Sequence, residues 1–71
     1  MNRNELRIEM IRHGDNGEDL AKALGISRQT LSRKMQDEAA EFTQKEIGHI
    51  KTRYGLSADR IDEIFFANIV S

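Results

Sequence analysis

Apolar residues recur at intervals of three and four along most of this chain, which is the spacing of one face of an α-helix. Proline is absent, so no position has to break a helix for lack of a backbone N–H. Glycines and short polar residues divide the pattern into five segments, each with its own apolar stripe. We therefore predict an all-α fold, a compact bundle of about five short helices.

The start of each predicted helix is marked by a residue that can accept a backbone N–H, or by glycine. These predicted caps are Asn4, Asn16 or Gly17, Ser27, Thr43 and Ser57. Thr43 is followed three residues later by Glu46, which is the pattern of a reciprocal capping box. The fourth helix is thus the one whose beginning is most sharply defined.

Glycine marks the ends of three predicted helices, because it takes the left-handed conformation that closes a helix without steric cost. These glycines are Gly14, Gly25 and Gly55. The fifth helix is expected to run from residue 58 to about 67, and residues 37–41 to form a fraying helix end and a loop. Gly48 lies inside the fourth helix, where glycine costs about 1 kcal/mol relative to alanine. We expect another backbone to approach it closely in compensation.

The predicted core consists of the apolar residues on the five stripes. They are Leu6, Met10, Ile11, Leu20, Ala21, Leu24, Ile26, Leu31, Met35, Ile47, Ile50, Tyr54, Ile61, Ile64 and Phe65.

A chain of 71 residues is the size of one small domain, and we treat residues 1–71 as one. There are no cysteines, so neither a disulfide framework nor a zinc–cysteine site is available. No apolar run approaches the roughly 20 residues of a membrane span, and no leader pattern precedes one, so we expect no membrane association and a cytoplasmic location.

The formal net charge is −1, but it is unevenly distributed. Residues 1–36 sum to +2 and residues 37–71 to −3, and every charge between Asp19 and Asp37 is positive. One face of the protein can therefore be basic although the whole is slightly acidic.

The segment LAKALGISRQTLSRK, residues 20–34, has spacing that constrains two helices meeting at a tight turn. A steep crossing needs a small residue facing the partner helix and a turn residue free to take positive φ. Ala21 meets the first requirement and Gly25 the second. Apolar residues on both sides of the turn would fill the space behind it.

This segment resembles the helix-turn-helix of the lambda-repressor and Cro family, the XRE-type domains of phage and bacterial regulators. The residues on the family's signature positions are Leu20, Ala21, Leu24, Gly25, Ile26, Ser27 and Leu31. The resemblance implies a five-helix bundle with the motif as its second and third helices, binding double-stranded operator DNA. Asp15, Gly17 and Lys34 depart from the family's usual residues.

The third predicted helix would then be the recognition helix in the major groove. With Leu31 and Met35 turned inward, Gln29, Ser32, Arg33 and Gln36 project outward, and no acidic residue shares that face. Arginine matches guanine O6 and N7, and glutamine matches adenine N6 and N7. The predicted base-reading residues are Arg28, Gln29, Ser32 and Arg33.

A second set suits the phosphate backbone, which orients a protein without conveying sequence. It comprises hydroxyls, an ammonium group and the amides at the start of the second helix: Asn16, Gly17, Ser27, Thr30 and Lys34. The alternative to DNA contact is that the polar residues on the outward side of the third predicted helix form an ordinary solvated helix face. Arg33 could also pair with Asp37 one helical turn later.

Catalysis and cofactor binding find little support. Glu46 and His49 have the Glu-x-x-His spacing of carboxylate-bridged metal bundles, but such sites need two copies and further glutamates. No nucleophile and base pair stands out. We expect no enzyme, metal, cofactor or small-molecule effector.

The stretch 64–70 is the most apolar of the chain, and one helix face can bury only part of it. With Phe65 in the core, Phe66, Ile69 and Val70 remain for a partner or for folding back over the bundle. We expect them to form a homodimer interface, because an operator of two half-sites needs two recognition helices. The predicted function is a Cro-like or repressor-like transcriptional regulator of phage or prophage type. The alternative is a protein-interaction or antitoxin-like module that binds a partner through this end.

Overall fold

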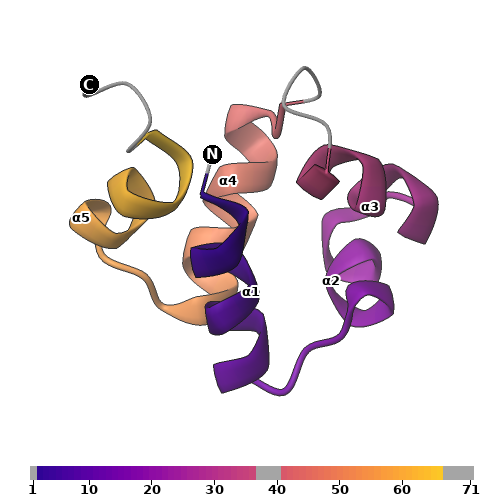
Figure 1. Ribbon diagram of the computed structural model, residues 1–71, viewed down its shortest axis with the longest axis horizontal. Coiled ribbons are helices and arrows are strands. Elements are labelled where there is room, and N and C mark those ends of the chain that lie inside the picture. The colour runs from indigo at the N-terminus through magenta and orange to yellow at the C-terminus, as the bar shows by residue number, and fades with distance from the viewer. Residues whose placement is uncertain (1, 37–40, 67–71) are drawn as a thin grey trace.

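The computed structural model describes residues 2–36 and 41–66, and its described part is helical without strands (Figure 1). The helices are α1 (Arg3–Arg12), α2 (Gly17–Leu24), α3 (Arg28–Gln36), α4 (Gln44–Tyr54) and α5 (Ala58–Ile61), followed by a π-helical turn, η1 (Asp62–Phe66). The predicted all-α bundle of five short helices is confirmed.

The two helices of the predicted motif lie together on one side of the molecule. In Figure 1, α2 and α3 are on the right, α5 is on the left, and α1 and α4 lie between them. α2 packs against both α3 and α4, while α1 packs against η1. The α2–α3 pair therefore rests on α4 and is open to solvent on its outer side.

Most helix starts follow the predicted caps. The side chains of Asn16, Ser27, Thr43 and Ser57 each accept the backbone N–H three residues on. The capping box of Thr43 and Glu46 is present in both directions, and α2 has a second one, formed by Asn16 and Asp19. Local side-chain chemistry thus sets four of the five starts.

The predicted start of α1 at Asn4 was wrong. The cap is Asn2, whose side chain accepts the N–H of Glu5, and Asn4 is an exposed residue within the helix. The backbone N–H of Asn2 donates to the carbonyl of Ile64 at 2.6 Å. This tertiary hydrogen bond fixes the chain at Asn2, so the helix begins two residues earlier than the local pattern suggested.

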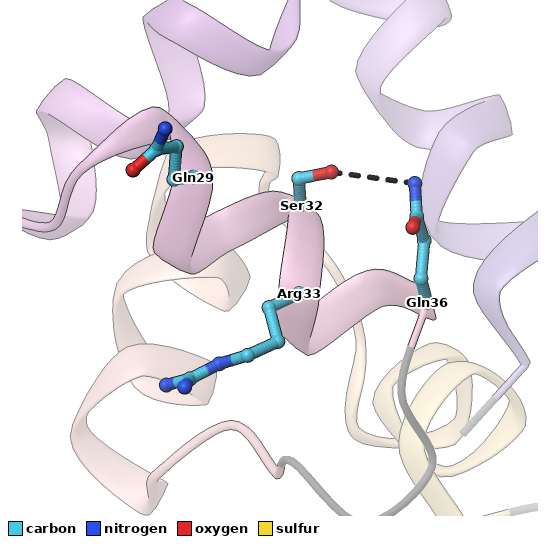
Figure 2. A pocket seen from close by; sticks show the side chains of 4 residues that line it. All are labelled: Gln29, Ser32, Arg33 and Gln36. Atoms are coloured by element: carbon cyan, nitrogen blue, oxygen red, sulfur yellow. Dashed lines mark hydrogen bonds between the residues drawn. The ribbon is translucent and has the colours of Figure 1, made fainter.

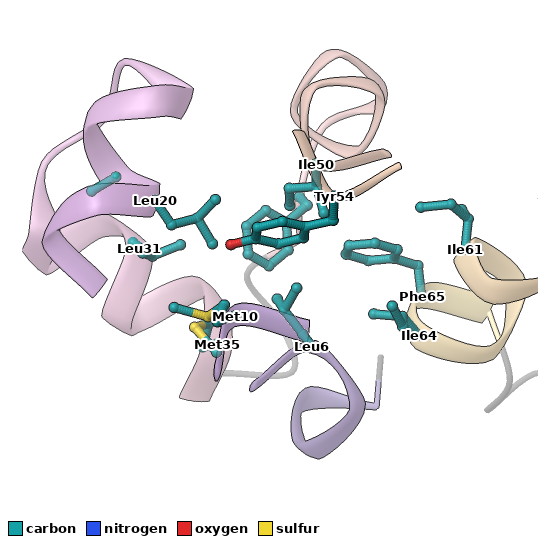
Figure 3. Packing of buried hydrophobic residues seen from close by; sticks show 12 residues of the cluster. Leu6, Met10, Leu20, Leu31, Met35, Ile50, Tyr54, Ile61, Ile64 and Phe65 are labelled. Carbon is teal, nitrogen blue, oxygen red and sulfur yellow. The ribbon is translucent and has the colours of Figure 1, made fainter. Parts of the chain in front are cut away.

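The core contains nearly all the predicted apolar residues (Figure 3). Five of them are essentially inaccessible: Leu6, Leu20, Leu31, Ile50 and Ile64. Ile11 does not join them, because 76% of it is exposed on the outer face of α1. Phe42, which precedes α4, is buried instead and contacts Phe65 edge to face, with ring centroids 5.7 Å apart.

The last helix differs from the prediction of one regular helix from 58 to about 67. Regular α-helix ends at Ile61, and the chain continues as the wider π turn of η1. Ile64 and Phe65 are buried in this turn and Phe66 is 43% exposed, as the pattern indicated, while Ala67 lies outside the described residues.

Charged side chains tie the last helix to the first. Arg60 of α5 donates through Nε to Glu9 at 2.8 Å and through Nη1 to Glu5 at 2.9 Å and Glu63 at 3.0 Å. The Glu9 side chain is only 4% exposed, so its carboxylate is held by protein donors and has little contact with water. These hydrogen bonds, first of all the one to Glu5, raise the pKa of Arg60 above its usual value.

Gly48 has no close neighbour, so the expected approach of another backbone was wrong. A Cβ built at Gly48 meets nothing within 4 Å, and the residue is exposed on α4. Its φ is not positive, unlike those of Gly14, Gly25 and Gly55. Glycine at this position therefore carries an uncompensated cost in backbone entropy.

We expect Gly48→Ala to raise the free energy of unfolding by roughly 0.5–1 kcal/mol, because alanine restricts the unfolded chain and fits the helix. Urea unfolding followed by circular dichroism would measure the change. Gly55→Ala is the matched control, since φ at Gly55 is +60° and alanine there is strained. A Gly48→Ala protein no more stable than the parent would contradict the prediction.

Candidate nucleic-acid interface

The turn between α2 and α3 has the geometry that the sequence predicted. Gly25 adopts φ 71° and ψ 28°, and its N–H donates to the Lys22 carbonyl. The N–H of Ile26 donates to the Ala21 carbonyl at 3.0 Å, which completes a Schellman motif. Ala21 is 3% exposed, as expected for the small residue where the helices meet. These bonds end α2 sharply and let α3 begin after Ser27.

The outward face of α3 forms a shallow, open hollow (Figure 2). It is lined by Gln29, Ser32, Arg33 and Gln36. These are the four residues that the helical spacing predicted to project outward, all are exposed, and α3 contains no acidic residue. Leu31 and Met35, on the opposite side of the helix, are buried. The packing of the inner face thus fixes which side chains face solvent.

Hydrogen-bonding groups fill this surface. Gln29 and Gln36 each offer an amide with donors and an acceptor, Arg33 offers a guanidinium, and Ser32 offers a hydroxyl. The Gln36 Nε2 atom donates to the Ser32 Oγ atom at 3.3 Å (Figure 2). The surface can therefore make several directional hydrogen bonds to a polar, electron-rich ligand such as the edges of bases.

Arg28 is exposed at the start of α3 but does not line the hollow. Its predicted role in base reading stays a prediction. The alternative pairing of Arg33 with Asp37 involves a residue outside the described ones.

Two predicted phosphate ligands, Ser27 and Thr30, are bonded to each other. The Ser27 hydroxyl accepts the N–H of Thr30 and donates to the Thr30 Oγ1 atom at 2.8 Å. A phosphate oxygen needs a hydrogen-bond donor. The Ser27 hydroxyl proton is already donated to Thr30, so the Thr30 hydroxyl proton is the one of the two that is left to bind a phosphate. The predicted roles stay predictions, and Thr30 is the better placed of the pair.

The start of α2 is less suited to an anion than the sequence suggested. The N–H of Asn16 donates to the Asp19 carboxylate at 3.1 Å, so that amide is not free. Glu18 and Asp19 both lie in the first turn and bring negative charge to it. The backbone N–H of Gly17, the other predicted phosphate donor, does not bond to the Asp19 carboxylate. A phosphate bound to it would lie near the carboxylates of Glu18 and Asp19.

Lys34 connects α3 with α4. Its Nζ atom donates to the Glu46 carboxylate at 2.9 Å and to the Glu41 carbonyl at 3.0 Å, and its side chain is 14% exposed. Burial raises the pKa of Glu46, but the N–H of Thr43 and the Lys34 ammonium lower it more, so the Glu46 pKa lies below its usual value. These contacts make Lys34 a link between α3 and α4, and its predicted phosphate contact stays a prediction.

Glu46 accepts hydrogen bonds from Lys34 and from the Thr43 amide through one oxygen, Oε1. Over residues 2–36 and 41–66, no group of three or more His, Cys, Asp or Glu side chains is arranged to hold a metal ion.

Asp15, which sequence reasoning treated only as a departure from the family pattern, anchors the turn before α2 to α4. Its carboxylate accepts two hydrogen bonds from Arg53, at 2.7 and 2.8 Å, and one from the Tyr54 hydroxyl at 2.7 Å. The His13 ring stacks on Tyr54 with centroids 4.7 Å apart. The Arg53 hydrogen bonds lower the pKa of Asp15, and burial together with Asp15 raises that of Tyr54.

This pairing predicts a loss of stability in acid. Because the Asp15 pKa is lower in the folded protein than in the unfolded chain, its stabilising effect is complete above about pH 4 and is lost as the pH falls through the folded value. We expect Asp15→Asn to show a smaller drop in unfolding free energy between pH 5 and pH 2.5 than the parent. Urea titrations at each pH would measure it, with the exposed Asp59→Asn as control. An equal drop in Asp15→Asn and the parent would contradict the prediction.

The predicted dimer residues are only partly described. Phe66 is 43% exposed at the end of η1, which follows α5 directly, while Ile69 and Val70 fall outside the described residues. In Figure 1, α5 and α3 lie on opposite sides of the molecule. Among the helices that the structure describes, none is long and apolar enough to cross a membrane.

Comparison with known proteins bears on the same region. The sequence model of a family described as "Bacterial regulatory protein, Fis family", a helix-turn-helix family, matches residues 10–37, which include α2 and α3. No curated protein and no solved structure gives a significant match. The matching family is not the lambda-repressor and Cro family that the sequence resembles, and the finer assignment is not confirmed. The match supports a helix-turn-helix DNA-binding regulator.

Proposed function

We propose that this protein is a sequence-specific transcriptional regulator, Cro-like or repressor-like and of phage or prophage type, that reads operator DNA with α3. The observation that carries the proposal is the acid-free outward face of α3, where Gln29, Ser32, Arg33 and Gln36 share one hollow. The buried residues behind them and the Lys34–Glu46 contact hold that face toward solvent. A helix presented in this way fits the major groove, which is about 12 Å wide.

The net charge of −1 bears on how such a protein would bind. Without a broad basic surface, non-specific attraction to the phosphates is weak, and affinity depends more on base contacts. Titration of mixed-sequence and selected duplexes at 50 and 200 mM salt would test the function. Affinity that falls with salt and is higher for selected duplexes supports it, and no binding at 50 mM would contradict it.

The proposal includes a homodimer formed through the C-terminal end. Phe66, 43% exposed beside the buried Phe65, supports a contact there, to which Ile69 and Val70 would add. Analytical ultracentrifugation of the free protein and of its DNA complex tests this. Phe66→Ala should shift the equilibrium toward monomer, whereas Ile8→Ala, an exposed apolar residue on α1, should not. A parent protein that is monomeric in both states at tens of micromolar would contradict it.

The second candidate is a protein-interaction or antitoxin-like module that binds its partner through the same end. The exposed Phe66 and the −3 charge of residues 37–71 favour it. The salt titration separates the two functions, because only the regulator requires binding to DNA.

A further inference from the structure

Gln36, the last residue of α3, belongs to the same surface as the predicted base-reading residues, although it was not among them. It lines the hollow with Gln29, Ser32 and Arg33 (Figure 2). Gln36 follows Gln29 by seven positions, which is nearly two full helical turns, so the two amides lie almost on one line along the helix. The structure thus presents two side-chain amides, one at each end of the outward face of α3.

The spacing of these amides matches a whole number of base pairs. Seven residues of α-helix rise about 10 Å, and successive base pairs in B-DNA are about 3.4 Å apart. A helix lying along the groove would therefore bring Gln29 and Gln36 to positions three steps apart. Ser32 and Arg33 lie between them and would face the intervening pairs.

The amide of Gln36 is partly oriented before any ligand binds. Its Nε2 atom uses one N–H on the Ser32 hydroxyl at 3.3 Å, which leaves the other N–H and the carbonyl oxygen available to a ligand. One donor and one acceptor side by side is the pattern that pairs with adenine N7 and N6. Ser32 is therefore a positioning residue for Gln36, in addition to any contact of its own.

We infer that the half-site read by α3 contains two A·T pairs three steps apart, one recognised by Gln29 and the other by Gln36, with a G·C pair between them recognised by Arg33. The inference rests on the proposed function and adds to it the chemistry of the ligand. It makes Gln36 a determinant of specificity and sets the length of the half-site core at four base pairs.

Selection of the full chain on random-sequence duplexes, followed by affinities for all four base pairs at each selected position, tests this. We expect replacement of the A·T pair read by Gln36 to weaken DNA binding by the parent protein about 5- to 150-fold. The same replacement should weaken DNA binding by Gln36→Ala less than about twofold, because this variant no longer reads that pair. Gln36→Glu should change the preference there toward C·G, because a carboxylate accepts from cytosine N4. Gln44→Ala, an exposed glutamine on α4, is the control and should behave as the parent.

Ser32→Ala should reduce discrimination at the pair read by Gln36 while leaving the pair read by Gln29 unchanged, which a general structural defect would not do. If the parent and Gln36→Ala discriminate equally among base pairs at every selected position, the inference is overturned but the proposed function is not. Failure to enrich any sequence, with equal affinity for all duplexes, would overturn the inference and the proposed function together.

Discussion

Arg60→Ala is expected to lower the free energy of unfolding by roughly 3 kcal/mol, as is typical when one member of a buried ion pair is removed. Glu9, with its side chain 4% exposed, would lose its shortest hydrogen bond and keep the longer one from Arg12. A chain of this size has a total stability of about 4–10 kcal/mol, so the loss is a large fraction of it. Urea unfolding at neutral pH, followed by circular dichroism, would measure the change.

Arg12→Ala is the matched control, because Arg12 bonds to the same Glu9 oxygen at 3.2 Å from a side chain that is 65% exposed. An exposed partner should contribute less than about 1 kcal/mol. Adding Glu9→Gln to Arg60→Ala should recover part of the loss, because the uncompensated charge is then removed. Equal effects of Arg60→Ala and Arg12→Ala would show that the charged cluster does not hold α5 on α1.

Arg33→Ala is expected to weaken binding to a selected operator by about 1–3 kcal/mol and to relax specificity at one base pair. Arg33 lines the hollow on α3 and is exposed, and its guanidinium makes no hydrogen bond or ion pair with residues 2–36 and 41–66. The unfolding free energy should therefore stay within about 0.5 kcal/mol of the parent. Fluorescence anisotropy with operator and with single-base variants would measure both effects.

Lys51→Ala, which removes an exposed cation from α4, controls for the change in net charge. It should reduce affinity for all duplexes slightly and equally, if at all. Operator binding by Arg33→Ala that equals the parent's would show that the reading face has been assigned to the wrong side chains.

Local chemistry explains why much of the fold was predictable. Caps such as Thr43 with Glu46, and left-handed glycines such as Gly25 and Gly55, act on backbone groups within a few residues. The start of α1 was missed because it depends on a hydrogen bond to Ile64, more than sixty positions away. The Arg60 cluster and the Asp15–Arg53 pair were missed for the same reason.

The outward face of α3 was predictable because exposure on a helix follows from its buried side. Once Leu31 and Met35 are inward, Gln29, Ser32 and Arg33 have to be outward. The contact of Lys34 with Glu46 was not predicted, because Glu46 is twelve residues away and its role was already explained by the capping box, and the phosphate role of Lys34 stays a prediction. One feature of the sequence could have indicated the contact of Lys34 with α4: in the lambda-repressor and Cro family, the position of Lys34 is often apolar.

The residues that hold α3 in place and those that would read DNA are separate sets. Leu31, Met35 and Lys34 hold the helix, whereas the residues that line the hollow are all exposed: Gln29, Ser32, Arg33 and Gln36. Substitutions among the second set should therefore be nearly neutral for stability. A few mutations in the second set would therefore change the DNA sequence that is bound without unfolding the protein. The fold then places little limit on how far the binding specificity of related chains can diverge.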